Sequence, residues 1–220
     1  MGSSAMTSAS SAEPPAFAVG VTQRVQIDPR HGERRDALDQ RWHPFLAACG
    51  IVGVPLPNDP ALALKSVRAL GLRGILLTGG NDLAVLGGDA PERDATEAAL
   101  LELAVRGLPV LGVCRGLQMI LAHFDAVPTP VAGHVAVRHP LVFQGQSRTV
   151  NSYHGYGAAA AMVAMATAGA LEVTAAVDGT VEAVRHRSLP IAGLMWHPER
   201  EAPFDPLDIE FFKNFFGATP

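Results

Sequence analysis

The sequence predicts an α/β fold: an open, mostly parallel β-sheet with helices on both faces and an antiparallel extension. In the first half of the chain, short apolar runs typical of strands buried on both faces alternate with helical patterns, which indicates βαβ units. In the second half, apolar strands follow one another closely, and Asp-Gly at 178–179 indicates a hairpin turn. The 220 residues, 48% of them hydrophobic, suffice for one compact domain with a substantial core.

Each element is predicted from its own local pattern. The strands expected in the parallel part of the sheet are the apolar runs at 17–21, 50–56, 73–78 and 108–114. The helices expected between and after them lie at 33–48, 60–70, 92–106 and 115–124. The strands expected in the antiparallel extension lie at 171–177, 181–187 and 191–196. An Ala-rich stretch at 158–170 is a candidate short helix, and 205–217, with its Asp start and Gly end, predicts a last helix.

The composition points to a small-molecule substrate. A net charge of -4 without a Lys/Arg block gives no electrostatic footprint for nucleic acid or a membrane surface. The two cysteines, Cys49 and Cys114, cannot build a disulfide framework and have no second ligand at zinc spacing, so we expect a reducing cytoplasm, no cofactor and no metal. Residues 1–16 are expected to be a disordered leader before a single domain at 17–217. The sequence leaves a homo-oligomer open.

The segment LGVCRGLQMI, residues 111–120, places Cys114 between Gly112 and Gly116 where a strand pattern gives way to a helical one. Gly-x-nucleophile-x-Gly is the pattern of a nucleophile elbow, a tight turn in which larger flanking side chains would collide with neighbouring elements. The start of the following helix favours a thiolate, the form of cysteine that attacks carbonyl groups. Because cysteine is also often buried, this pattern alone leaves a core thiol as the alternative.

The segment LMWHPER, residues 194–200, supplies the partners that a nucleophile needs. His197 and Glu199 are two positions apart, so in an extended segment the carboxylate faces the same way as the imidazole and can orient it. A thiol, an imidazole base and an orienting carboxylate are the parts of a nucleophilic triad if the fold brings Cys114 to His197. The alternative is a surface turn in which Glu199 pairs with Arg200.

The segment LLTGGND, residues 76–82, ends the third predicted parallel strand. Gly79 and Gly80 allow backbone N–H groups to point into a crevice and stabilise an oxyanion, with the Arg115 N–H as the second donor. Gly-Gly-Asn-Asp is also a strong turn sequence whatever the function. The three segments all fall at the carboxyl ends of predicted strands, where open α/β sheets carry their sites.

Together, TGGND, GVCRGLQMI and MWHPER resemble the class I glutamine amidotransferase superfamily, in particular its stand-alone γ-glutamyl hydrolase branch. The resemblance covers about residues 17–217, with the motifs in the family's order. It implies that Cys114 forms a γ-glutamyl thioester, that His197 acts as base and then as acid, and that Glu199 orients His197. It also implies that Gly80 and Arg115 supply the oxyanion N–H groups.

The same resemblance implies which residues bind the substrate. Gln118, one turn after the cysteine, matches a family glutamine that helps to hold the glutamyl group, and Gly79 belongs to the same site. The segment VNSYHGYG, residues 150–157, is similar to a family segment that faces the α-amino end of the substrate. It supplies the candidate binding residues Asn151, Ser152, Tyr153 and His154. His134 and His139 resemble family positions near the site, but each can equally be a structural imidazole, and neither is assigned a catalytic role.

Four further segments, VTQRV, ERRDALDQRW, GHVAVRHPL and WHPEREAPF, look like those of family members that hydrolyse γ-glutamyl-CDP-amidate for capsule phosphoramidate synthesis. The pyrophosphate-like anion of that leaving group needs several cationic partners. Arg24, at the rim that carries Cys114, is the main candidate. Arg34 and Arg35, expected at the start of a helix, can do the same or pair with acidic neighbours on a solvated face.

Three alternatives to this substrate stay open at the level of sequence. One is hydrolysis of γ-glutamyl-γ-aminobutyrate or another γ-glutamyl amine. The second is a glutaminase subunit that supplies ammonia to a separate synthetase. The third is a non-catalytic relative retained for binding, against which the complete set of Cys114, His197 and Glu199 argues.

Overall fold

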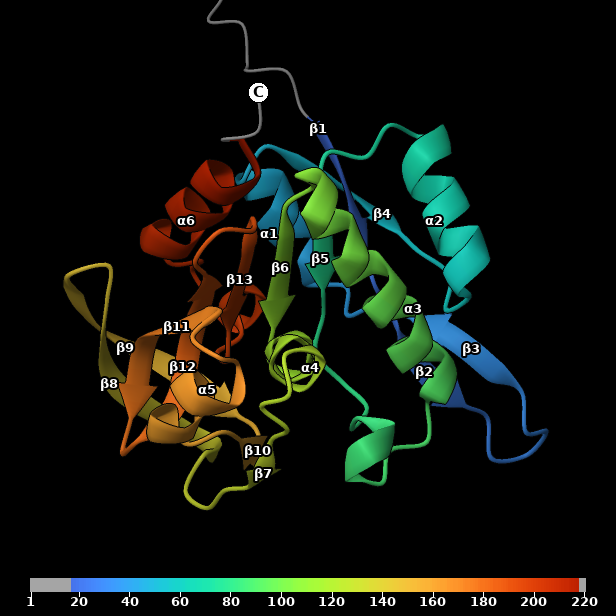
Figure 1. The fold of residues 1–220 in the computed structure, drawn as a ribbon. Coiled ribbons are helices and arrows are strands. Elements are labelled where there is room, and N and C mark those ends of the chain that lie inside the picture. The colour runs from blue at the N-terminus through green and yellow to red at the C-terminus, as the bar shows by residue number, and fades with distance from the viewer. Residues whose placement is uncertain (1–16, 218–220) are drawn as a thin grey trace, which may run out of the picture.

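A computed structural model describes residues 17–217, and the expected leader at 1–16 lies outside the described residues. The core of the fold is a seven-stranded sheet (Figure 1). Its strands, in the order in which they pair, are β11 (Leu171–Val177), β12 (Thr180–His186), β13 (Ile191–Leu194), β6 (Val110–Val113), β5 (Ile75–Leu77), β1 (Phe17–Val21) and β4 (Ile51–Pro55). The run from β13 to β4 is parallel, whereas β12 pairs antiparallel with both β11 and β13. The predicted α/β sheet with an antiparallel extension is confirmed.

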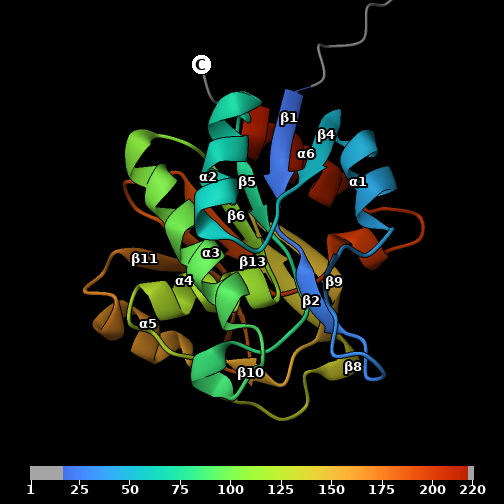
Figure 2. The ribbon, with the colours of Figure 1, turned by 90° about the vertical axis from the view of Figure 1, so that its right-hand side faces the viewer.

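Helices cover both faces of this sheet (Figures 1 and 2). One layer consists of α2 (Pro60–Ala69), α3 (Pro91–Leu101), α4 (Arg115–His123) and α5 (Ala160–Ala166). The opposite layer contains α1 (Trp42–Ala48) and α6 (Pro206–Gly217). Short 3-10 turns complete the helical elements: η1 (Ala84–Leu86), η2 (Glu102–Arg106) and η3 (Pro198–Arg200). Among residues 17–217, each helix is too short or too polar to cross a lipid bilayer.

Successive residues of the central strands face opposite layers. In β5, Ile75 and Leu77 pack with the layer that contains α2 to α4, and Leu76 packs with the layer of α1 and α6. All three side chains are fully buried. Because a parallel strand covered on both faces has no solvent side, its sequence is a continuous apolar run, which is why the central strands could be predicted.

A long hairpin joins the layer of α1 and α6. It consists of β8 (Val135–Phe143) and β9 (Gln146–Tyr153), which pair antiparallel, and its side chains Leu141, Phe143 and Val150 belong to the core of that layer. Gln144 and Gly145 both have positive φ, as a tight two-residue turn requires. Two short strands, β7 (Thr129–Pro130) and β10 (Tyr156–Gly157), also pair. The sequence analysis did not predict the hairpin, because most of β8 is exposed and shows no core pattern.

The predicted helix at 33–48 is wrong in its first part. Arg34–Ala37 forms a strand, β3, that pairs antiparallel with β2 (Arg24–Ile27), and only Trp42–Ala48 is helical. Asp28 and Gly32 close the turn, because the Gly32 N–H donates to the Asp28 carbonyl and Gly32 has a φ of +66°. Pairing with β2 determines the conformation of residues 34–36, although Leu38 lies at helical spacing from Arg34 and Arg35.

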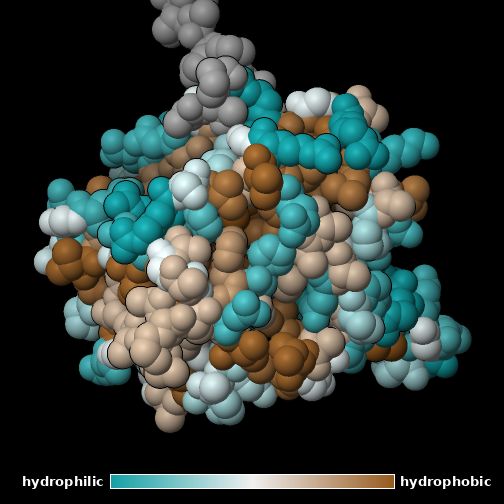
Figure 3. All heavy atoms as spheres, viewed as in Figure 1, coloured by the Kyte–Doolittle hydropathy of each residue, from teal (hydrophilic) through white to brown (hydrophobic). Residues whose placement is uncertain are grey.

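The other predicted elements are present with shifted ends. The strands at 17–21 and 171–177 match β1 and β11, whereas the predicted helix at 92–106 is α3 followed by η2. The face in Figure 3 mixes hydrophilic and hydrophobic residues, and its tan area at the lower left lies over the alanine-rich α5. Met162 and Met165 of this helix are exposed.

The close approach of α4 to β5 depends on Gly116. A Cβ added there would lie 2.2 Å from the Leu77 carbonyl oxygen, which is backbone and cannot rotate away. We therefore expect Gly116→Ala to lower the free energy of unfolding by about 2 kcal/mol or more, although alanine is the better helix former. Urea unfolding measures this. Gly155→Ala is the matched control, because no atom lies within 4 Å of its added Cβ; equal stability of the two variants would contradict the steric argument.

Candidate active site

Cys114 lies in a strained turn between β6 and α4. Its φ of 53° and ψ of −106° are unfavourable for a residue with a Cβ. Two hydrogen bonds hold this conformation: the Cys114 N–H donates to the Leu194 carbonyl at 2.8 Å, and its own carbonyl accepts from the Gln118 N–H at 3.1 Å. A Cβ on Gly112 would lie 2.5 Å from the Gly116 carbonyl, so the strand and helix approach this closely only with glycine at both positions. The segment thus has the geometry of a nucleophile elbow.

The structure brings His197 and Glu199 to Cys114. His197 follows β13, and its Nδ1 lies 2.6 Å from Glu199 Oε1 in a buried contact. The Cys114 thiol lies close enough to this ring to interact with it electrostatically. A Cβ on Gly79 would lie 2.8 Å from His197 Cε1 and 3.6 Å from Cys114 Cβ, so Gly79 leaves room for the imidazole. The surface turn with a solvated Glu199–Arg200 pair is not present, since Glu199 is 2% exposed.

The electrostatics of this group favour a protonated imidazole. Burial lowers the pKa of His197, but the Cys114 thiolate and the Glu199 carboxylate outweigh burial and raise the pKa to about 10. At neutral pH the ring then carries a positive charge and holds a proton that it can give to a leaving group.

Asn151 of β9 holds the backbone of His197. Its Oδ1 accepts from the His197 N–H at 2.9 Å, and its Nδ2 donates to the His197 carbonyl at 2.8 Å. Nδ2 also donates to Glu201 at 2.8 Å, so both amide hydrogens are used. Asn151 was expected to bind the substrate, but its side chain instead holds the backbone of His197 in place.

The loop after β5 presents the predicted oxyanion N–H. Arg93 of α3 donates to the carbonyls of Thr78, Gly79 and Gly80 at 2.7, 3.1 and 2.7 Å. In a trans peptide the N–H points opposite to the C=O, so the Gly80 N–H points away from Arg93. Gly80 has a φ of +90° and lines the same cleft as Cys114. Arg115 is the first residue of α4, where a backbone N–H has no partner within the helix.

A buried cluster of charged side chains, Arg93, Glu97 and Arg115, connects this loop to the elbow. Glu97 accepts from Arg93 Nε at 3.0 Å and from Thr22 Oγ1 at 2.7 Å, and it also pairs with Arg115, whose second partner is Asp94. Burial raises the pKa of Glu97, but Arg115 and Arg93 outweigh burial and hold the pKa below its usual value. Burial lowers the pKa of Arg93 to about 10, which still leaves the guanidinium charged at neutral pH.

The sequence analysis did not single out Arg93 and Glu97. The sequence does contain a pattern that indicates this pair. Positions 93, 97, 100 and 104 lie on one face of a helix, and the last two residues of this stripe, Leu100 and Ala104, are apolar. All four side chains are buried. A charged pair on the apolar stripe of a helix is unusual and indicates a buried ion pair.

A cleft of about 330 Å³ opens beside Cys114. Its lining residues are Gly80, Asn81, Asp82, Cys114, Arg115, Gln118, Tyr153, His154, Gly155 and Tyr156. Of the predicted binding residues, Gln118, Tyr153 and His154 therefore face it, and the Gln118 amide donates to the Tyr156 carbonyl at 3.0 Å. Ser152 does not line the cleft; it is buried and donates to the His134 carbonyl at 2.7 Å.

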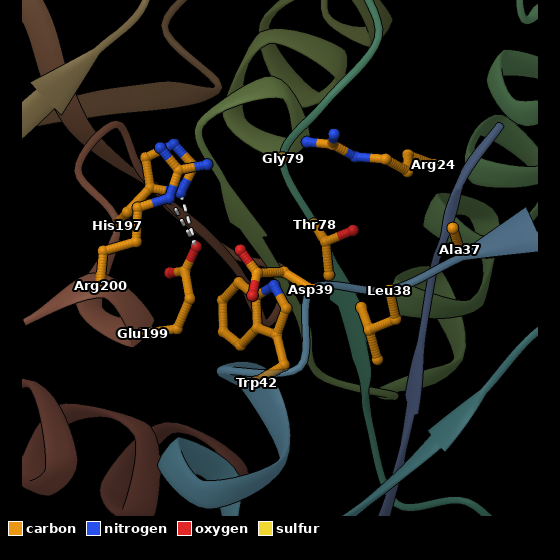
Figure 4. A pocket seen from close by; sticks show the side chains of 10 residues that line it. All are labelled: Arg24, Ala37, Leu38, Asp39, Trp42, Thr78, Gly79, His197, Glu199 and Arg200. Carbon is orange, nitrogen blue, oxygen red and sulfur yellow. Dashed lines mark hydrogen bonds and ion pairs between the residues drawn. The ribbon is translucent and has the colours of Figure 1, made fainter. Parts of the chain in front are cut away.

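A second hollow, of only about 10 Å³, is lined by His197 and its neighbours (Figure 4). Arg24, Gly79 and Arg200 line it together with the imidazole. Arg24 opens β2 and is half-buried, and among residues 17–217 no hydrogen bond or ion pair occupies its guanidinium. Arg200 lies over the Tyr153 ring at 4.8 Å, with its Nε 3.7 Å from Glu199.

The other two arginines considered for an anion lie on β3 and are already paired. Arg34 contacts Glu92 and the Asp89 carbonyl, and Arg35 contacts Glu33. Pairing with acidic groups is therefore the correct interpretation of both, although Glu92 is distant in sequence.

The match to a family model agrees with this geometry. The model described as glutamine amidotransferase class-I matches residues 53–218, so the chain belongs to the class I glutamine amidotransferase family. A solved structure described as a GMP synthase component from Thermoplasma acidophilum superposes with a TM-score of 0.67 at 20% identity, covering 93% of this chain and 94% of that one. The glutaminase domain of Trypanosoma brucei CTPS gives a TM-score of 0.65 at 14% identity, covering 93% and 95%. Both likenesses concern the fold.

Several relatives with known names indicate which reactions are found among proteins similar to this chain. Gamma-glutamyl-CDP-amidate hydrolase from Campylobacter jejuni is 28% identical over 90% of this chain and 97% of that protein. The glutamine-hydrolysing GMP synthase component of Methanospirillum hungatei is 31% identical over 67% of this chain and 73% of that one. The carbamoyl phosphate synthase small chain of Desulfovibrio desulfuricans is 28% identical over 80% of this chain but only 44% of that one. The family and these relatives support hydrolase activity on a γ-glutamyl amide.

The charge state of His197 can be measured directly. We expect its imidazole to stay protonated at neutral pH and to lose the proton only as the pH rises toward about 10. Because this pKa lies above the ordinary 6.5, the protonated ring stabilises the folded state; the contribution is complete below pH 6.5 and is lost as the pH rises through about 10. NMR titration of histidine labelled at Cε1 measures the pKa.

Cys114→Ala tests the cause of this shift. Without the thiolate, burial is opposed by Glu199 alone, and the pKa of His197 should drop. Cys49→Ala is the control, because burial raises the pKa of that distant thiol to about 12 and keeps it uncharged. A His197 pKa that is the same in Cys114→Ala as in the wild type would contradict the ion pair.

Proposed function

We propose that the protein is a cysteine hydrolase that cleaves a γ-glutamyl amide-type bond through a γ-glutamyl thioester. The observation that carries this proposal is the buried array of Cys114, His197 and Glu199 beside a cleft, with Nδ1 of the imidazole 2.6 Å from the carboxylate. In the proposed roles, Cys114 is the nucleophile, His197 is the base and acid, and Glu199 orients the imidazole.

The reaction proceeds in two halves. The Cys114 thiolate attacks the γ-carbonyl carbon, and the Gly80 and Arg115 N–H groups stabilise the oxyanion. His197 then gives its proton to the departing nitrogen, and the C–N bond breaks to leave the thioester. In the second half, His197 takes a proton from water, the hydroxide adds to the thioester, and glutamate leaves as the thiolate reforms.

The cleft beside Cys114 and the hollow beside His197 suggest how the substrate is oriented. The glutamyl group fits the larger cleft, which Gln118, Tyr153 and His154 line. The leaving nitrogen has to face His197, so the rest of the leaving group would lie toward the mouth of the hollow of about 10 Å³ that Arg24 and Arg200 line. Asp39 and Glu199 line the same hollow, and Glu199 is engaged by His197, so the Arg24 guanidinium is the main contact for an anionic leaving group.

We infer that γ-glutamyl-CDP-amidate is the substrate, with CDP-amidate and glutamate as the products. The Arg24 guanidinium supports an anionic leaving group, and the name of the Campylobacter jejuni relative supports a diphosphate in that group. By this inference the protein acts in the synthesis of capsule phosphoramidate, in the cytoplasm.

A glutaminase subunit is the second candidate, because the GMP synthase and carbamoyl phosphate synthase relatives are named as parts of synthetases. The two candidates differ in what the isolated protein does. A glutaminase subunit would prefer glutamine and would respond to its synthetase partner, whereas the hydrolase acts alone on a γ-glutamyl conjugate.

The purified chain decides between the substrates. We expect glutamate release from γ-glutamyl-CDP-amidate to exceed that from glutamine and γ-glutamyl-γ-aminobutyrate by at least about tenfold in kcat/KM, because each charged contact to the leaving group contributes about 1.5–3 kcal/mol. Cys114→Ala should abolish turnover of all three and Cys49→Ala of none. Preference for glutamine or for the aminobutyrate conjugate would refute the proposed substrate.

Arg24→Gln tests the role of the leaving-group hollow. Loss of one charge-assisted contact should lower kcat/KM for γ-glutamyl-CDP-amidate by about 10- to 100-fold while changing that for glutamine, which has no anionic leaving group, by less than about threefold. Arg68→Gln, on the exposed side of α2, is the control and should change neither value. If kcat/KM fell equally for both substrates, Arg24 would act on the loop after β5 or on the reaction itself, and not on the leaving group.

A further inference from the structure

Three histidines and a glutamate from separate segments meet beside the cleft. His134 precedes β8, His139 lies on β8, His154 follows β9 and Glu182 lies on β12. The ring centroid of His134 is 4.5 Å from that of His139 and 4.7 Å from that of His154. Glu182 is fully buried, and His134 and His154 are nearly so. None of these groups has a step in the proposed hydrolysis.

Several polar atoms in this cluster have no hydrogen bond within the part of the chain that the structure describes. They are His134 Nδ1, His139 Nε2 and Glu182 Oε2, and all are buried. His134 Nδ1 lies 3.2 Å from Glu182 Oε1, but without the geometry of a hydrogen bond. Three such atoms in one place are exceptional, because nearly all buried polar atoms in proteins have a partner.

Glu182 is shared between two of the histidines. His154 Nδ1 lies 3.1 Å from the Tyr156 carbonyl, which can only accept, so this nitrogen carries a proton. His154 Nε2 lies 3.3 Å from Glu182 Oε1, the same oxygen that lies 3.2 Å from His134 Nδ1. Glu182 Oε2 has no partner among the described residues, and a bound cation would supply one.

We propose that His134, His139 and Glu182 form a zinc-binding site. One donor atom from each of the three side chains lies within 4.8 Å of the other two. Ligands about 2.0–2.2 Å from a tetrahedral zinc ion are about 3.5 Å apart, so small side-chain rotations bring the three atoms to that spacing. Two imidazoles and a carboxylate are an ordinary donor set for zinc, with the fourth position left to water. His139 is half-buried and gives the ion a route from solvent.

Such an ion would have a structural effect on the site. Zinc would join β8 and the loop before it to β12 of the central sheet, and thereby fix the hairpin whose second strand carries Asn151. Asn151 in turn holds the His197 backbone. The zinc site is independent of the proposed reaction, so its test does not depend on the substrate.

The experiment uses the full chain without an affinity tag, as Cys114→Ala, so that the thiol cannot supply a competing site. The protein is stripped with a chelator, equilibrated with zinc and analysed for bound metal, and cobalt is substituted to record the absorption of a tetrahedral site. We expect about one zinc per chain, and a cobalt spectrum with nitrogen and oxygen but no sulfur ligands. A hundredfold excess of zinc over its Kd should raise Tm by about 5 °C.

His139→Gln and Glu182→Gln should each reduce bound zinc at least about tenfold and remove the rise in Tm. His43→Gln, an exposed histidine on α1, is the control and should retain the metal. If Glu182→Gln does not fold, His139→Gln still provides the test, because His139 is only half-buried. The proposal would be overturned if the Cys114→Ala protein bound no zinc, or if the added His139→Gln substitution left the amount of bound zinc unchanged.

Discussion

The ion pairs of Glu97 connect the elements that form the site. This carboxylate lies between the guanidinium groups of Arg93 and Arg115, and all three side chains are buried. Burying one charge costs several kcal/mol unless it is paired, so these groups are stable only together. Arg93 fixes the carbonyls of the loop after β5, and Arg115 begins the helix of the elbow. The N–H groups proposed to stabilise the oxyanion and the proposed nucleophile, Cys114, are therefore held by one shared set of ion pairs.

A second constraint comes from the hairpin of β8 and β9. It packs on the opposite side of the sheet from α4 and places Asn151 against His197. The imidazole is thereby fixed twice, at its ring by Glu199 and at its backbone by Asn151. Elements from both halves of the chain are needed to bring the thiol and the imidazole together, because Cys114 and His197 follow neighbouring parallel strands.

The elements that could be predicted from the sequence are those whose local pattern has one structural meaning. Buried parallel strands are continuous apolar runs, so β1, β5 and β6 could be predicted, and the residues after them fall at one edge of the sheet. Strand pairing at exposed positions has no such pattern. For this reason Arg34 and Arg35 were assigned to a helix although they lie on β3, and the hairpin of β8 and β9 was not predicted.

By itself the sequence determined the sheet, the elbow and the candidate Cys114, His197 and Glu199, because these depend on apolar runs, on glycines and on a spacing of two residues. Only the tertiary structure decided where the other side chains point. It directed Asn151 to His197, placed Arg24 in the hollow beside the imidazole, and brought Glu182 from β12 to the histidines of another strand. Contacts between residues distant in the chain arise from packing and register, and no local pattern records them.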